Sequence, residues 1–292
     1  MRDLEAISSD SKAFIQGATA LPLPFTGQNR SLVSRKGLQT CSSWRQLSIR
    51  HLPRLAPRYT MSGVNGGIDY EIDLSSLSPT LARQIKHVQE GPDSPTELIN
   101  AATTIASSRL PQTLPVLVDM LGYNNPAAAN IAVKALVEAG SSSIPHLLQG
   151  VAAFNYSVNA YALRALGQIG DCSVFDVCLK CAESGPIPNV RRAACKALTG
   201  LNLDSREDIK KVYECLMTLI ENEAEWSVRY AALAAIEAFN YVDRLEKDER
   251  HKLRAVVENI ALGDDKDPAV VARAQFLLRS SKFFEGEAMI TR

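Results

Sequence analysis

A nine-residue pattern recurs through the middle and the end of the chain. Residues 190–198 read VRRAACKAL and residues 228–236 read VRYAALAAI, and VNAYALRAL at residues 158–166 is a third copy. The small residues of each copy stand four and then three positions apart, so they line one face of a helix. Alanine on that face lets a neighbouring helix approach closely, and the branched residue that ends each copy fills the core. The pattern therefore predicts a row of closely packed helices.

Three weaker copies extend the repeat. The six copies end at residues 106, 136, 166, 198, 236 and 278, which are 30, 30, 32, 38 and 42 residues apart. Further amphipathic segments precede the copies, at residues 114–121, 144–148, 174–181, 209–220 and 253–262. Each pair of helices buries its apolar face only by stacking on the next pair. The sequence predicts an all-α fold: a HEAT-type α-solenoid, an ARM-like superhelix of about six helical hairpins, at residues 74–281.

Composition and charge exclude several other classes of protein. Aromatic residues make up only 6% of the chain, which disfavours a β-sandwich or barrel. No run of about 18 apolar residues occurs, so no membrane span is expected. The zero net charge averages two unlike parts: residues 1–68 carry nine basic and three acidic residues, a net of +6, so residues 69–292 carry −6. A negatively charged body is not expected to bind nucleic acid, because phosphate neutralisation needs a basic surface.

The amino-terminal segment differs from the rest of the chain. Residues 11–68 contain no acidic residue and are rich in Ser, Thr, Leu and Arg. Such a composition buries too little apolar surface to fold alone, and it is typical of an organelle transit peptide. We expect a disordered plastid transit peptide at residues 1–61, a linker at 62–73 and a flexible tail at 282–292, with the protein in the chloroplast stroma. Mitochondrial import and a plain disordered tail are the alternatives.

Four segments are more specific than the repeat itself. They read LPVLVDMLGYNNP at residues 114–126, FNYSVNAYALRALGQIGD at 154–171, NVRRAA at 189–194 and EWSVRYAA at 225–232. In this order and spacing they resemble the HEAT-repeat phycobilin (phycocyanobilin) lyases, above all the F-type subunit of the E/F heterodimer. The plastid relatives of that subunit, including phycobilisome-degradation proteins, belong to the same resemblance, which spans roughly residues 80–240.

The resemblance implies a function in pigment attachment or removal. It implies two interlocked solenoids, this chain and an E-type HEAT-repeat partner, that hold an open-chain bilin or another tetrapyrrole and need no further cofactor. The pair would attach the pigment to a cysteine of a chromophore-carrying protein or detach it, a phycobilin:cysteine lyase-like activity whose catalytic residues are not identified. The isomerising branch carries an adjacent His-Cys pair, and no histidine here is followed by Cys, so isomerisation is not expected. The alternative is a non-catalytic adaptor for photosynthetic or other proteins of the chloroplast stroma.

Aromatic, amide and cationic side chains recur near the starts of the repeated helices. A tetrapyrrole site needs aromatic faces for stacking, cations for the propionates and a carboxylate for the pyrrole N–H groups. Stacked repeats would bring these helix starts onto one edge of the solenoid. The predicted tetrapyrrole- or partner-binding residues are Tyr123, Asn124, Asn125, Tyr156, Asn159, Arg164, Arg191, Arg192, Trp226, Arg229 and Tyr230. For Arg191 and Arg229, hydrogen bonding between adjacent repeats is the alternative.

The cysteines do not predict a metal site. Cys178 and Cys181 form the only Cys-x-x-Cys, within a helical segment, where we expect them to be buried small apolar residues. A redox pair is the alternative. A structural zinc site needs four converging ligands, and the chain offers no second Cys-x-x-Cys or His pair. The acidic run at residues 264–267 lacks the glycine and the glutamate of a calcium loop, so no metal is expected.

Overall fold

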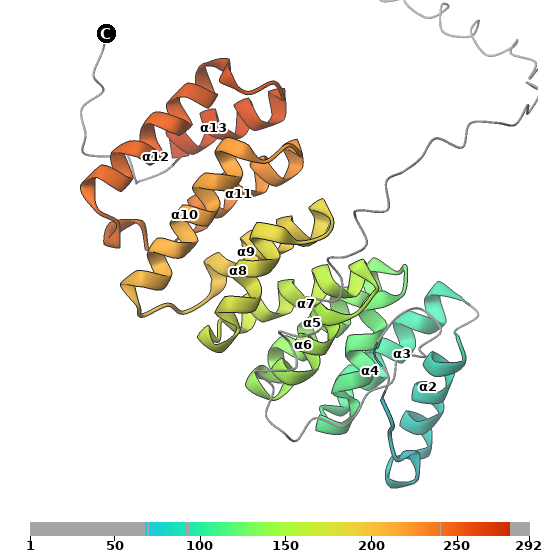
Figure 1. Cartoon of the computed structure of the whole chain (residues 1–292). Helices are drawn as coiled ribbons and strands as arrows, with labels where there is room; N and C mark the ends of the chain where they lie inside the picture. The colour runs from blue at the N-terminus through green and yellow to red at the C-terminus, as the bar shows by residue number, and fades with distance from the viewer. Residues whose placement is uncertain (1–67, 69, 92–93, 240, 281–292) are drawn as a thin grey trace, which may run out of the picture. The chain divides into compact units, whose positions relative to one another are not determined.

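The computed structural model describes residues 68, 70–91, 94–239 and 241–280. All of them lie in the second of the chain's two units, Gln39–Arg292, and the predicted transit peptide and tail lie outside the described residues. Twelve α-helices within these ranges form six successive pairs, as Figure 1 shows. The first helices of the pairs are α2 (Pro79–Glu90), α4 (Leu114–Asp119), α6 (Ile144–Ala152), α8 (Phe175–Ser184), α10 (Arg206–Asn222) and α12 (Lys247–Asn259). The second helices are α3 (Pro95–Ser108), α5 (Pro126–Glu138), α7 (Tyr156–Ile169), α9 (Pro188–Gly200), α11 (Trp226–Ala238) and α13 (Pro268–Ser280).

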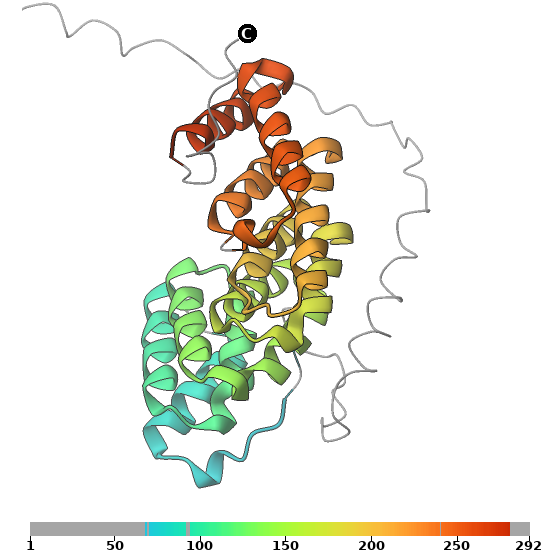
Figure 2. The same ribbon diagram turned by 90° about the vertical axis from the view of Figure 1, so that its left-hand side faces the viewer.

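Short turns of helix join these elements. They are the 3-10 helices η2 (Leu74–Ser76), η3 (Pro111–Thr113), η4 (Met120–Gly122), η5 (Gly140–Ser143), η6 (Cys172–Val174) and η7 (Val242–Arg244), and the π-helical turn η8 (Ile260–Asp264). The pairs follow one another in chain order from the first to the last (Figure 2). The predicted all-α solenoid of about six hairpins is therefore confirmed.

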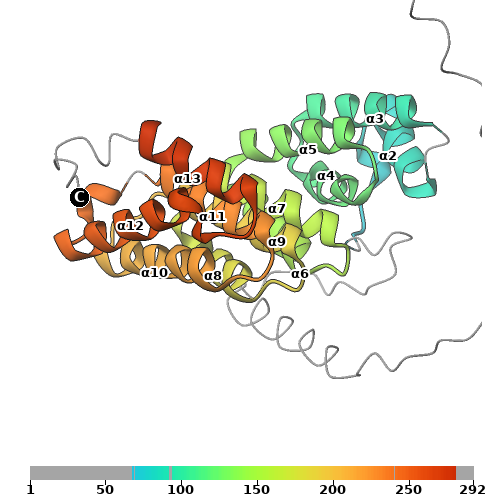
Figure 3. The same ribbon diagram turned by 90° about the horizontal axis from the view of Figure 1, so that it is seen from above.

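The two helices of each pair belong to two different layers. Second helices pack on second helices, from α3 through α13, and the first helices lie along their other side (Figure 3). The repeated nine-residue pattern explains this arrangement. In α9 its small and branched positions, Val190, Ala194, Ala197 and Leu198, are all buried. They form one continuous core with their equivalents in the other second helices, as the spacing predicts.

The joint between α7 and α9 is unusually close. A side chain at Gly200 would place its Cβ 2.1 Å from the carbonyl oxygen of Gly167, and a Cβ at Gly167 would lie 2.5 Å from the Cα of Ala197. Just beyond, Gly170 ends α7 in the left-handed region at φ 76°, and its carbonyl oxygen accepts a hydrogen bond of 2.9 Å from the backbone N–H of Asn202. Only glycine fits where two backbones meet in this way.

The first pair is extended by the segment that leads into it. Ile68 and Tyr70, which lie in the predicted linker, pack on the core, and Ile68 is 8% exposed. Tyr70 faces Asp119 of α4, and burial raises the pKa of Asp119 to about 6. Contacts of the solenoid therefore begin before residue 74.

Candidate functional site

The eleven predicted site residues separate into two groups. One group is buried or half-buried and hydrogen-bonded within the solenoid: Tyr123, Asn125, Asn159, Arg191 and Arg229. The other group is exposed: Asn124, Tyr156, Arg164, Arg192, Trp226 and Tyr230. The residues near the helix starts thus include both side chains that hydrogen-bond within the solenoid and side chains that are accessible on its surface.

Arg191 joins α9 to the next pair. Its Nε donates to Glu223 Oε2 at 2.8 Å and its Nη2 to Glu223 Oε1 at 3.0 Å, while its Nη1 donates to the Gly185 carbonyl oxygen at 2.9 Å. Burial alone would raise the pKa of Glu223, but the hydrogen bonds from Arg191 and from backbone N–H groups hold it below its usual value. A bidentate pair of this kind fixes the relative orientation of two repeats.

Arg229 makes the same connection one repeat later. Its guanidinium donates to both carboxylate oxygens of Asp265, at 2.7 and 2.8 Å, and to the carbonyl oxygens of Glu223 and Ala224. Both side chains of this ion pair are largely buried, and the hydrogen bond from Arg229 lowers the pKa of Asp265. The inter-repeat hydrogen bonding that was the alternative for Arg191 and Arg229 is what the structure shows.

Amide side chains perform related tasks in the earlier repeats. Asn125 caps α5 by accepting from the N–H groups of Ala127 and Ala128, and its Nδ2 donates to the Pro95 carbonyl oxygen at 3.0 Å. Asn155 caps α7 and donates to the Gly122 carbonyl oxygen at 3.2 Å.

Two further predicted residues are also held by backbone carbonyls. The Nδ2 of Asn159 lies 2.8 to 3.0 Å from the carbonyl oxygens of Gly150, Val151 and Ala153, at the end of α6. The Tyr123 hydroxyl donates to the Val88 carbonyl oxygen at 2.6 Å. Both residues have structural partners inside the solenoid.

The exposed aromatic residues occupy a repeated position. Tyr156 and Trp226 are the first residues of α7 and α11, and they are 46% and 44% exposed. Tyr230 lies one turn after Trp226, and the guanidinium of Arg273 lies 5.7 Å from its ring centre. Large apolar groups exposed at equivalent positions are candidates for ligand or partner contact.

Trp226 borders a groove of about 780 Å³ that is lined by the ends of α10 and α12, the start of α11 and the loop before α13. Six of its lining residues are acidic and two are basic. The acidic residues are Glu221, Glu223, Glu225, Asp264, Asp265 and Asp267. Arg191 and Arg229 neutralise two of these carboxylates, so the groove has an aromatic rim and a net negative wall. The carboxylates of this wall can accept hydrogen bonds from N–H groups of a ligand.

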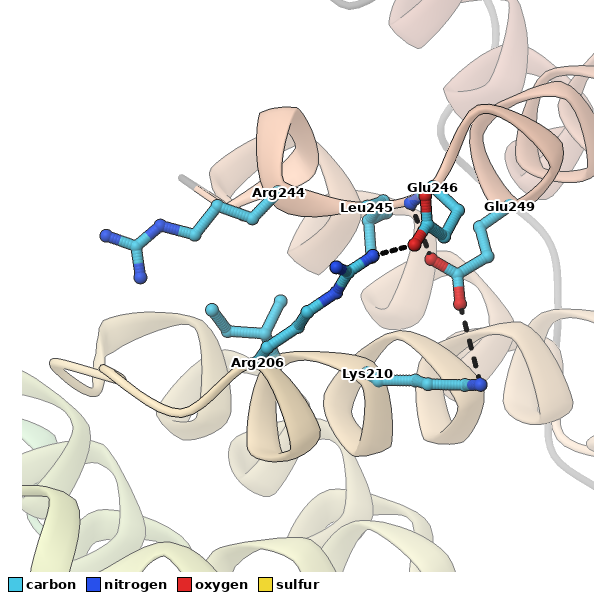
Figure 4. Close-up of a pocket in the computed structure, with 7 residues that line it drawn as sticks. Arg206, Lys210, Arg244, Leu245, Glu246 and Glu249 are labelled. Carbon is cyan, nitrogen blue, oxygen red and sulfur yellow. Dashed lines mark hydrogen bonds and ion pairs between the residues drawn. The ribbon is translucent and has the colours of Figure 1, made fainter.

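A second cavity, of about 160 Å³, is less suited to a ligand. It lies between the start of α10 and the turn before α12, and Figure 4 shows its charged residues satisfying one another. Arg206 pairs with Glu246, and the Nζ of Lys210 lies 3.9 Å from Glu249 Oε1. Arg244 points away from these pairs (Figure 4) and donates to the Leu203 carbonyl oxygen at 3.3 Å. We therefore place the candidate site at the groove beside Trp226.

The groove carboxylates were missed by reasoning from the sequence. Glu223 and Asp265 each stand three residues before the first residue of the next second helix, Trp226 and Pro268. An arginine at the second position of one copy, followed by an acidic residue at that place before the next copy, is the signal that could have found them.

Cys178 and Cys181, the Cys-x-x-Cys pair, do not form a reactive site. Cys178 and Cys181 are buried, as expected for small apolar residues. Burial raises the pKa of Cys178, and it raises the pKa of Cys181 to about 12, so neither thiol is ionised at neutral pH. Among the described residues, no group of three His, Cys, Asp or Glu side chains could hold a metal ion. None of the described helices is both long and apolar enough to cross a membrane.

Comparison with known proteins agrees with this fold. A family model described as HEAT repeats matches residues 144–237. Phycocyanobilin lyase subunit beta of Nostoc sp. (strain PCC 7120) is 35% identical over 196 residues, which are 65% of this chain and 94% of that relative. The bilin biosynthesis protein RpcF of Synechococcus sp. (strain WH8020) is 31% identical over 208 residues, 70% of this chain and 98% of that relative.

A solved structure is also similar. It is the complex of CpcE and CpcF of phycocyanin lyase from Nostoc sp. PCC7120, of which one chain is 33% identical, with a TM-score of 0.49 over 56% of this chain and 97% of that one. The sequence relatives are matched over almost their whole length at more than 30% identity. The chain therefore belongs to the family of HEAT-repeat phycocyanobilin lyase beta subunits.

Proposed function

We propose that this protein is a plastid member of the bilin lyase type that binds an open-chain tetrapyrrole, its carrier protein or both. It would serve attachment, detachment or turnover of the chromophore. The observation that carries the proposal is the match over 94% of a phycocyanobilin lyase beta subunit at 35% identity. That relative is named a beta subunit, which supports a second subunit as partner, and we propose that this partner is an E-type HEAT-repeat chain.

The groove beside Trp226 supplies chemistry that suits such a pigment. Its volume of about 780 Å³ lies within the usual range for small-molecule sites. The indole of Trp226 offers a face for stacking. Glu225, Asp264 and Asp267 line the same groove, and their carboxylates would accept hydrogen bonds from pyrrole N–H groups. Lys266, also on the wall, offers a cation for a propionate.

Attachment would use a thiol from another protein. The acceptor thiolate forms a C–S bond with the ethylidene carbon, the C=C electron pair moves into the pyrrole system, and a proton completes the addition without oxidation or reduction. Of the described cysteines, Cys172 is exposed, whereas Cys178, Cys181, Cys195 and Cys215 are buried, with pKa values raised by burial. The four buried thiols are therefore poor nucleophiles. The role of this chain would be to position the pigment.

An absorbance titration of the full chain with an open-chain bilin tests the proposal. We expect saturable one-to-one binding, and we expect Trp226→Ala to weaken it about tenfold because a stacking face is lost. Phe154→Ala is the matched control, because Phe154 is 50% exposed and does not line the groove. Equal affinities of Trp226→Ala and the unsubstituted chain would contradict the placement of the pigment, and no binding would contradict the proposal.

A non-catalytic adaptor in the stroma is the second candidate function. Tyr156 and Trp226, exposed at the same repeat position in α7 and α11, favour it because aromatic side chains are common in protein interfaces. A co-precipitation from plastid extract distinguishes the two functions. Loss of a specific partner on Trp226→Ala, with no bilin binding by the unsubstituted chain, would support the adaptor.

The location in a plastid rests on the acid-free, basic segment at residues 11–68. An import assay with isolated chloroplasts tests it. We expect a protease-protected product shortened by about 60 residues, as an organelle leader implies, and equal protection by mitochondria would contradict plastid targeting.

A further inference from the structure

The exposed side of the second-helix layer carries a row of cations in its middle repeats. Lys134 of α5, Arg164 of α7 and Lys196 of α9 stand two residues before the ends of three successive copies, and all three are exposed. Arg192 lies one turn before Lys196 on the same helix and is exposed as well. We call these four residues the basic stripe. Three of the four share one repeat position, so the stripe crosses three successive helices of the layer.

Few carboxylates of the layer neutralise the basic stripe. The helices α7 and α9 contain no Asp or Glu. The Nη1 of Arg164 donates to the neutral amide of Asn130 at 3.0 Å. The Nζ of Lys134 lies 3.9 Å from Glu138, whose carboxylate also lies 3.8 Å from Arg109. Exposed ion pairs at such distances interact only weakly, so they do not cancel the positive charge of the stripe. The stripe is therefore a positive region on a body whose net charge is −6.

The spacing of the stripe follows from the packing of the layer. Adjacent packed helices lie about 8–10 Å apart, and the contact of Gly167 with Ala197 keeps α7 close to α9. The cations of the three helices therefore step across the surface at intervals of about 10 Å or slightly less. On an α-helix, residues seven positions apart are separated by about 10.5 Å and lie on nearly the same face. The stripe thus matches a helix that carries a carboxylate at every seventh position.

We propose that the basic stripe docks an acidic helical segment of a partner protein. A small ligand would take a concave site. None of the four residues lines the two cavities described above, or a third cavity of about 420 Å³ that is bordered by Leu110 and Ala139. Charge complementarity selects a carboxylate-bearing partner and aligns it along the layer. The surface is separate from the groove, so the inference does not depend on pigment binding.

Fluorescence anisotropy with a labelled helical peptide tests the proposal. The probe carries Glu at every seventh position, and its control carries Gln there. We expect the full chain to bind the Glu peptide and not the Gln peptide. Affinity should fall about tenfold for the double variant Arg164→Glu/Lys196→Glu, because two attractive contacts become repulsive. Raising the salt from 0.05 to 0.3 M should weaken binding of the unsubstituted chain.

A matched variant separates the stripe from net charge. Arg83→Glu/Lys247→Glu changes the charge equally, at two exposed residues of the first helices α2 and α12, and should leave the affinity within about twofold, since distant surface charges are screened. Circular dichroism confirms that both variants are folded. Equal effects of the two double variants, or equal binding of both peptides, would overturn the proposal. Loss of bilin binding by Arg164→Glu/Lys196→Glu with peptide affinity unchanged would overturn it too and assign the stripe to a small carboxylate.

Discussion

The early and the late repeats are connected to their neighbours by different kinds of side chain. Between α3, α5 and α7 the joints use the amides of Asn125 and Asn155, which donate to backbone carbonyl oxygens of the preceding pair. Between α9, α11 and α13 they use the ion pairs of Arg191 with Glu223 and of Arg229 with Asp265. The copy spacing grows from 30 to 42 residues in the same direction.

The boundary between the two halves lies at α7 and α9, where backbone meets backbone at Gly167 and Gly200. Because stability in a solenoid is close to a sum over neighbouring repeats, each joint can be weakened separately. Repeats built on one sequence pattern can therefore respond differently to pH, salt and substitution.

The largest effect is expected at the buried ion pair of the last joint. Arg229→Ala should lower the free energy of unfolding by about 3 kcal/mol, because it leaves the carboxylate of Asp265 buried without its partner. Urea unfolding followed by circular dichroism measures this. Arg164→Ala, which removes an arginine bonded to an exposed amide, should cost less than about 0.5 kcal/mol. An equal loss of unfolding free energy in the two variants would show that the ion pair does not stabilise the late joints.

A smaller cost is expected at the boundary. Gly200→Ala should destabilise by about 2 kcal/mol, since its Cβ would require α7 and α9 to move apart. Thr199→Ala, at the neighbouring position of the same helix, is the control and should cost about 1 kcal/mol or less for its lost hydrogen bond. Thermal unfolding of the two variants measures the difference. A lower midpoint temperature for Thr199→Ala than for Gly200→Ala would contradict the close packing of α7 on α9.

The amide joints should be the weakest of the three kinds. Asn155→Ala removes a helix cap and one hydrogen bond to Gly122, which together should cost about 1 kcal/mol. Asn155→Asp keeps the cap but loses the amide donor, so it should fall between the alanine variant and the unsubstituted chain. A larger loss of unfolding free energy for Asn155→Ala than for Arg229→Ala would show that the amide joints are stronger than the ion-pair joints.

The two halves should also respond oppositely to acid. The pKa values of Glu223 and Asp265 are lowered in the folded chain, so their stabilisation is present above their unfolded pKa values and is lost as pH falls through the folded ones. The pKa of Asp119 in α4 is raised to about 6, so the stability of the early repeats falls as pH rises from about 4 to 6. Hydrogen exchange read by mass spectrometry should show α11 and α13 opening first below about pH 4.

Asp119→Asn isolates the early part of that response. It should raise the free energy of unfolding by about 1 kcal/mol at pH 7.5, because the buried charge is removed, and should have no effect near pH 4. A destabilised variant at pH 7.5 would mean that the ionised carboxylate has a favourable partner.

Much of the fold was predictable, because the buried positions of the repeat, such as Val190 and Leu198, define both the helix face and the stacking direction. The joints were less predictable. The sequence around Arg191 and Arg229 does not distinguish an arginine that faces a groove from one that bonds to a neighbouring repeat. The distinction depends on where Glu223 and Asp265 lie in space. Of the predicted site residues, Trp226 was placed at a groove, whereas the acidity of that groove depends on side chains from two loops about 40 residues apart.

The proposed pigment site is tested most directly by the fluorescence of Trp226. The chain has two tryptophans, Trp44 and Trp226, so Trp44→Phe leaves the groove residue as the only reporter. Titration of this variant with an open-chain bilin should quench its emission saturably at one pigment per chain. Full emission at saturating pigment would contradict a bilin site beside Trp226.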